Sequence, residues 1–171
     1  PAAKFDAQQA AGLVVSLPMP EGGFERFEIV ESPIMAPELA ARFPEIRTYR
    51  GQGLDDPGAT VRLDVTPAGF HGMVLTPQGN VFIDPYLRGS TELYRSYLIS
   101  DMGSAPASLS CGVHASGSFP GPQPRLGPSK ALSGTTLRTY RLAVAATGEY
   151  TAFHGGTRAQ GQAAIVTAMN R

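Results

Sequence analysis

Several short stretches in the first hundred positions of the chain have the character of β-strands, and in those at 24–31 and 60–65 hydrophobic and polar residues alternate. The stretches lie at residues 12–17, 24–31, 46–51, 60–65, 69–75, 81–85 and 93–99. Alternation with a period of two is typical of a strand that buries one face. Short segments rich in Gly, Pro, Asn and Asp separate several of these stretches, so the pattern predicts an antiparallel meander.

The stretch at 60–65 shows the alternation most clearly. Three aliphatic side chains are expected to face the core, and the two charged side chains between them are expected to face solvent. The expected inward residues are Val61, Leu63 and Val65, and the expected outward residues are Arg62 and Asp64.

Two segments have the signals of helices. The first is a short helix at 36–43, with Pro37 in its first turn and Pro44 directly after it. The second covers 157–170, with Thr157 as the expected N-cap and apolar residues at helical spacing. Strands with one or two helices predict an α+β chain in which antiparallel β structure predominates.

The segment at 137–147 contains the run Leu142-Ala143-Val144-Ala145-Ala146, which is apolar on both faces of a strand. Such a run predicts a central strand covered by helices. A single buried strand followed by a single helix cannot close a core. We therefore expect residues 137–171 to be the beginning of a second domain.

Composition agrees with a β-rich chain that contains one long connection. The 171 residues include 20 Gly and 15 Pro and no Trp, which favours turns and short strands over a helical bundle. Gly, Pro and Ser concentrate at 115–136, which predicts a linker. The predicted organisation is thus a domain at 1–114, a linker at 115–136 and a fragment of another domain at 137–171.

The net charge is zero, but the charges are unevenly distributed. Residues 1–110 carry 8 Lys and Arg against 13 Asp and Glu, and residues 111–171 carry 6 against 1. The two parts could attract each other, or both could simply be solvated surfaces. The basic residues do not cluster with aromatics and no stretch could span a membrane, so we expect neither a nucleic-acid nor a membrane partner.

Two blocks of short segments carry a family resemblance. The first block is Phe27-Glu28-Ile29-Val30-Glu31-Ser32-Pro33-Ile34-Met35, Phe43-Pro44-Glu45-Ile46-Arg47-Thr48-Tyr49, Gly69-Phe70-His71 and Phe82-Ile83-Asp84-Pro85-Tyr86. The second is Tyr140-Arg141-Leu142-Ala143-Val144-Ala145-Ala146-Thr147-Gly148-Glu149-Tyr150. They resemble the propeptide and the first catalytic strand of bacterial secreted metalloproteases of the reprolysin-like branch of the metzincins. In that family, residues 157–170 would form the first helix of the catalytic domain.

The resemblance implies a zymogen, which is the precursor of a secreted zinc endopeptidase. The zinc-binding motif H-E-x-x-H-x-x-G-x-x-H is absent, and His71, His114 and His154 lie far apart in sequence. We therefore expect no catalytic residue in this chain and no zinc bound by it alone. Its expected partners are its own catalytic domain and an activating protease. The first residues have no signal-peptide pattern, so the expectation of secretion rests on the resemblance.

The lone cysteine is the candidate inhibitory zinc ligand. Ser110-Cys111-Gly112-Val113 resembles the Cys-Gly-Val core of metzincin cysteine switches, although no basic residue precedes the cysteine. A thiolate is a strong zinc ligand that can occupy the position of the attacking water. Gly112 would let the backbone enter the cleft, with Val113 completing the switch loop. The alternative is that Cys111 is a small buried apolar residue.

Activation would require cleavage of the predicted linker, for which Arg125, Lys130 and Arg138 are the candidate positions. The competing interpretation is a non-enzymatic β-rich binding module or a free-standing protease inhibitor. In that case residues 137–171 would pack onto the sheet. Weaker candidates, each expected to be structural, are His71, His154, Glu149 and the pair Asp55-Asp56.

Overall fold

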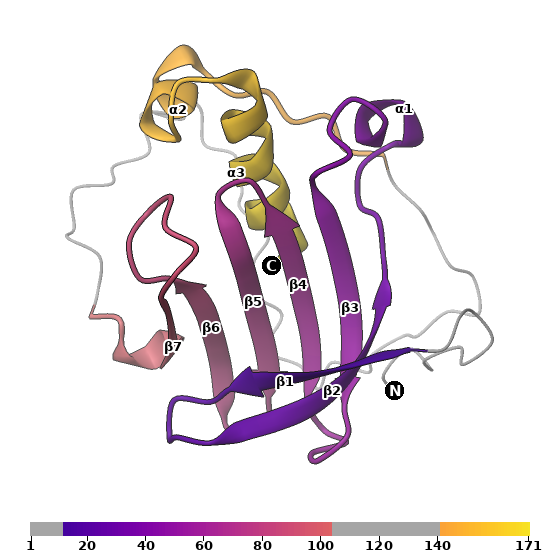
Figure 1. Ribbon diagram of the computed structural model, residues 1–171, viewed down its shortest axis with the longest axis vertical. Coiled ribbons are helices and arrows are strands. Elements are labelled where there is room, and N and C mark those ends of the chain that lie inside the picture. Colours follow the sequence, from indigo (N-terminus) through magenta and orange to yellow (C-terminus); the bar gives the residue numbers. More distant parts are fainter. Residues whose placement is uncertain (1–11, 104–140) are drawn as a thin grey trace, which may run out of the picture. The chain divides into compact units, whose positions relative to one another are not determined.

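A computed structural model describes residues 12–103 and 141–171. Seven antiparallel strands form one sheet whose spatial order follows the sequence (Figure 1). The predicted meander is confirmed, because every neighbouring pair is antiparallel. The strands are β1 (Leu13–Pro18), β2 (Phe24–Glu31), β3 (Arg47–Gly53), β4 (Thr60–Thr66), β5 (Gly69–Thr76), β6 (Gly79–Pro85) and β7 (Tyr94–Leu98).

The sheet curls into a half-barrel, so that β1 and β2 pass across one face of the other strands (Figure 1). The main apolar core lies on this inner face and includes Phe27, Leu63, Val74 and Ile83. Gly51 lets β2 approach β3 closely, because a Cβ atom there would lie 2.6 Å from the Glu28 carbonyl oxygen. Burial of the alternating apolar residues therefore explains both the strands and the curl.

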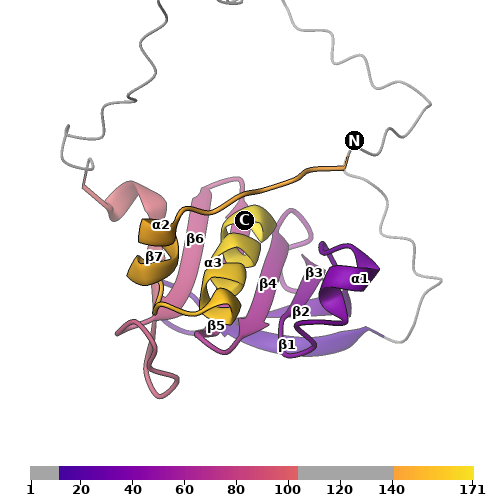
Figure 2. The same ribbon diagram turned by 90° about the horizontal axis from the view of Figure 1, so that it is seen from above.

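The helical elements are α1 (Pro37–Ala40), the 3₁₀ turn η1 (Ile99–Asp101), α2 (Gly148–Phe153) and α3 (Arg158–Asn170). Helix α3 lies on the outer face of the sheet, opposite the β1–β2 hairpin (Figure 2). Thr157 caps α3 as predicted and forms a reciprocal capping box with Gln160. Ala163 and Val166 of this helix pack with Ile46 in a second, smaller apolar cluster.

The predicted helix at 36–43 is longer than the observed one. Helix α1 ends at Ala40, and beyond it Arg42 and Phe43 donate to the carbonyls three residues earlier, Leu39 and Ala40. These are turn hydrogen bonds rather than α-helical ones. Pro44 explains the early end, since a residue before proline is disfavoured in the α conformation.

The predicted strand at 137–147 is wrong over the part that the structure describes. Residues 141–147 have no strand assignment, and Leu142 and Val144 are 69% and 49% exposed. A strand requires a hydrogen-bonded partner, and β1 to β7 pair only with one another. Residues 137–140 lie outside the described ranges.

The predicted burial of two β4 side chains is also wrong, although each side chain lies on the face of the sheet that was expected for it. Asp64 is only 1% exposed, whereas Val65 is 43% exposed. The prediction assumed a sheet covered on one face, but α3 covers the outer face of β4, where Asp64 lies. Val65 stands at the end of the strand on the inner face, beyond the main core.

Helix α3 and the sheet belong to the same compact unit. That unit contains residues 12–103 and 144–171 of the described chain. The predicted boundaries at 114/115 and 136/137 lie outside the described residues and stay predictions. Within residues 12–103 and 141–171, no helix has the length and apolar character that crossing a membrane would demand.

Candidate functional site

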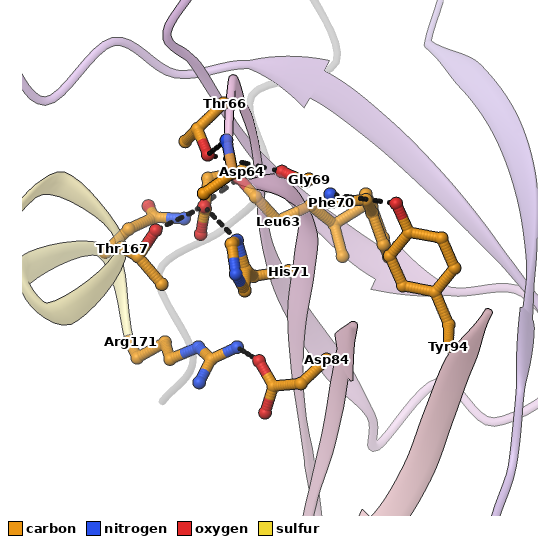
Figure 3. A network of polar contacts seen from close by, with 12 residues as sticks. Leu63, Asp64, Thr66, Gly69, Phe70, His71, Asp84, Tyr94, Thr167 and Arg171 are labelled. Atoms are coloured by element: carbon orange, nitrogen blue, oxygen red, sulfur yellow. Dashed lines mark hydrogen bonds and ion pairs between the residues drawn. The ribbon is translucent and has the colours of Figure 1, made fainter. Parts of the chain in front are cut away.

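A buried carboxylate on β4 joins the sheet to α3. Asp64 lies directly opposite His71 in the β4–β5 register, and its Oδ2 is 3.0 Å from the His71 Nδ1. The same oxygen accepts a 2.7 Å hydrogen bond from the Thr167 hydroxyl of α3 (Figure 3). A buried carboxylate is costly unless it is hydrogen-bonded, so the two contacts stabilise Asp64 where it lies.

A second carboxylate, Asp84 of β6, binds the end of the same helix. Its Oδ2 accepts a 2.7 Å hydrogen bond from the Tyr97 hydroxyl, and its Oδ1 accepts one from the Arg171 guanidinium. Burial alone would raise the pKa of Asp84, but these hydrogen bonds outweigh it and lower the pKa. Burial and the bond to Asp84 raise the pKa of Tyr97 to about 12.

A third contact fixes the position of the helix along the sheet. The Asn170 Nδ2 donates a 2.9 Å hydrogen bond to the Leu63 carbonyl oxygen, and Asn170 is buried. Thr167, Asn170 and Arg171 therefore all bind the sheet from the C-terminal end of α3. Figure 3 shows Thr167 and Arg171 pointing towards Asp64 and Asp84. We call these three residues, with Asp64, His71 and Asp84, the helix-docking network.

The turn between β4 and β5 positions the sheet side of this network. The Thr66 hydroxyl accepts a hydrogen bond from the Ala68 N–H and donates to the Gly69 carbonyl. Gly69 has φ of +119°, which residues with a Cβ rarely adopt. This tight turn fixes the register that places Asp64 opposite His71.

A cavity of about 610 Å³ adjoins the network, lined by parts of β5, β6, β7, α2, α3 and the loop after β6. Most of its ionisable side chains are basic: His71, Arg88, Arg95, His154 and Arg171. Asp84 is the single carboxylate among its lining residues. The cavity therefore has a positive electrostatic character.

The network does not have the arrangement of a nucleophilic catalytic site. The Thr167 hydroxyl donates to Asp64, whereas nucleophile activation requires a hydroxyl that donates to the histidine. Throughout the described residues, no three His, Cys, Asp or Glu side chains gather to hold a metal ion. The geometry instead serves to dock a helix.

The predicted switch and cleavage residues all fall outside the described ranges. They are Cys111, Gly112, Val113, Arg125, Lys130 and Arg138, and their roles stay predictions. The residues of the helix-docking network were not among those chosen for zinc chemistry.

The weaker candidates lie in three separate places. Asp55 lies in a turn as predicted, where its carboxylate binds Arg26, and hydrogen bonds from Arg26 lower its pKa. His154 follows α2, and burial and the nearby charge of Arg88 lower its pKa. Glu149 lies in the first turn of α2. Only His71 belongs to the helix-docking network.

Sequence reasoning missed the functional pairing of the acidic residues in the network. Asp64 and Asp84 lie in strands, and nothing in the neighbouring sequence shows that a helix covers them. The opposition of Asp64 and His71 across a predicted hairpin was the available signal, because alternation and a short turn define the register. No known protein family, no curated protein and no solved structure matches this chain.

Proposed function

We propose that this chain is the latency-conferring proregion of a secreted zinc metalloendopeptidase, followed by the opening segment of its catalytic domain. One observation carries the proposal beyond the sequence resemblance. His71 and Asp84, from the propeptide-like block, lie in the helix-docking network under α3, which follows the catalytic-like block. A residue of the first block, Asp84, thus binds Arg171 at the end of the helix that follows the second block.

The chemistry of this contact suits an interface between a proregion and its enzyme. Interfaces between domains are more polar than domain cores, and the last turn of α3 binds the sheet through a hydroxyl, an amide and a guanidinium. Loss of one partner leaves a buried polar group unsatisfied. Such contacts therefore favour one defined position of the helix on the sheet over non-specific association.

In this proposal the sheet holds the catalytic domain while Cys111 blocks its metal. The zinc would be bound by catalytic residues beyond those described, and the Cys111 thiolate would supply a fourth ligand in place of water. Cleavage at Arg125, Lys130 or Arg138 would break the peptide chain between the proregion and the catalytic domain. The helix-docking network would then remain as a non-covalent contact.

The proposal is tested by Cys111→Ala in the full-length precursor, with Ser110→Ala as the matched control. We expect the Cys111 variant to hydrolyse a peptide substrate before linker cleavage, because water could then occupy the open position on the metal. The Ser110 variant should stay latent. Unchanged latency and an unchanged activation rate in Cys111→Ala would refute the switch.

The second candidate is a non-enzymatic β-rich binding module or protease inhibitor. The observation that favours it is that α3 packs on the sheet within a single compact unit. The two candidates differ in the coding sequence beyond Arg171. A metzincin zinc-binding motif in frame supports the proregion, and a stop codon supports the module.

A further inference from the structure

Three arginines are held in position around the cavity beside the helix-docking network. The Arg88 guanidinium lies 3.8 Å from the centre of the Phe153 ring, and its Nη1 donates to the Phe153 carbonyl. Two further guanidinium groups lie over rings of the sheet, Arg95 over Tyr97 at 5.0 Å and Arg171 over Phe82 at 4.8 Å. Stacking restrains each planar group before any ligand arrives.

The carboxylate in the cavity lining neutralises only one of these three arginines. Asp84 is already bound to Arg171 and Tyr97. Neither Arg88 nor Arg95 takes part in any salt bridge found within residues 12–103 and 141–171. Two exposed guanidinium groups therefore line one cavity without an acidic partner from the described chain.

The neighbouring titratable groups respond to this excess of positive charge. The charge of Arg88 adds to burial in lowering the pKa of His154, another lining residue. The charges of Arg171 and Arg95 also act on Tyr97. They partly offset burial and the bond to Asp84, which together raise its pKa. A positive cavity with restrained guanidinium forks is the environment that binds oxyanions.

We propose that this cavity is a binding site for a small oxyanion, a carboxylate or a phosphate group, held by the guanidinium groups of Arg88 and Arg95. A guanidinium fork matches the two oxygens of either group. A volume of about 610 Å³ is large enough for a small organic anion. The site does not depend on protease latency, so it would exist in a proregion and in a binding module alike.

The test is calorimetric titration of the full chain with citrate and, separately, with inorganic phosphate at constant ionic strength. Sodium chloride at the same ionic strength is the reference. We expect saturable binding with a dissociation constant on the order of 1 mM for the better anion. Stronger binding of citrate would identify a carboxylate ligand, and stronger binding of phosphate would identify a phosphate-bearing one.

Arg95→Gln is the decisive variant, because Arg95 restrains no backbone group in the described structure, unlike Arg88. It should weaken binding about tenfold, whereas Arg62→Gln, an exposed arginine elsewhere on the sheet, should have no effect. Circular dichroism of both variants checks that the fold is kept. The proposal is overturned if neither anion binds beyond the chloride reference, or if the two variants bind equally well.

Discussion

The hydroxyl of Thr167 donates a 2.7 Å hydrogen bond to the carboxylate of Asp64, which lies 103 positions earlier in the chain. Asp64 is buried within the sheet and has His71 as its other side-chain partner. A long-range hydrogen bond to a buried charge is worth more than one at the surface. The pair is therefore the point at which docking of α3 is most sensitive to substitution.

A double-mutant cycle on Asp64 and Thr167 measures this coupling. Asp64→Asn and Thr167→Val should each lower the free energy of unfolding, by about 2 kcal/mol and about 1 kcal/mol respectively. Thr167→Val removes this hydrogen bond and Asp64→Asn removes the charge that strengthens it, so the double variant should lose about 1 kcal/mol less than the sum. Urea unfolding of the four proteins provides the free energies, and strictly additive losses would show that the bond is not formed.

Tyr97 should titrate at an unusually high pH. The ultraviolet absorbance of the phenolate should report a pKa of about 12, because burial and the hydrogen bond to Asp84 favour the neutral phenol. Asp84→Asn should move the pKa back towards the ordinary value of about 10. An unchanged titration in Asp84→Asn would contradict the hydrogen bond.

The same shift predicts how stability depends on alkaline pH. The folded-state pKa of Tyr97 lies above the unfolded value, so its contribution is complete below pH ~10 and is lost as the pH rises through about 12. Urea midpoints measured across this range should fall less steeply in Tyr97→Phe than in the parent chain, since phenylalanine has no hydroxyl to ionise.

Gly51 should not tolerate a side chain, whereas Gly148 should. A Cβ at Gly51 would lie 2.6 Å from the Glu28 carbonyl oxygen, and a Cβ at Gly148 would meet nothing within 4 Å. Gly51→Ala should lower the free energy of unfolding by about 2 kcal/mol, because the backbone of β2 or β3 must move to make room for the methyl group. Gly148→Ala in the first turn of α2 should raise it by about 0.5 kcal/mol. Equal stabilities would disprove the close approach of β2 to β3.

The strand order was predictable because alternation and turn residues are local signals. The stretch at 60–65 was recognised as a strand, yet Asp64 was assigned to solvent, because alternation cannot reveal that a distant helix covers the second face. The helix at 157–170 was recognised by Thr157 and its spacing, but its contacts with Asp64 and Asp84 span about half of the chain.

Other errors have equally local physical causes. Helix α2 was overlooked because the apolar run before Thr147 predicted a strand, although Thr147 caps the helix by accepting from the Tyr150 N–H. An apolar run can be extended without being paired, and pairing depends on a partner strand that the run itself does not specify. The basic cavity was invisible for the same reason, since Arg88, Arg95 and Arg171 are scattered in sequence.

The polar character of the last turn of α3 has a consequence for how the helix can come away from the sheet. Thr167, Asn170 and Arg171 would be hydrated after release, and Asp64, His71 and Asp84 would become a wettable surface. Separation at this end would thus expose mainly polar groups, together with the small apolar cluster of Ile46, Ala163 and Val166. The contact between the sheet and this end of the helix is therefore suited to reversible association in water.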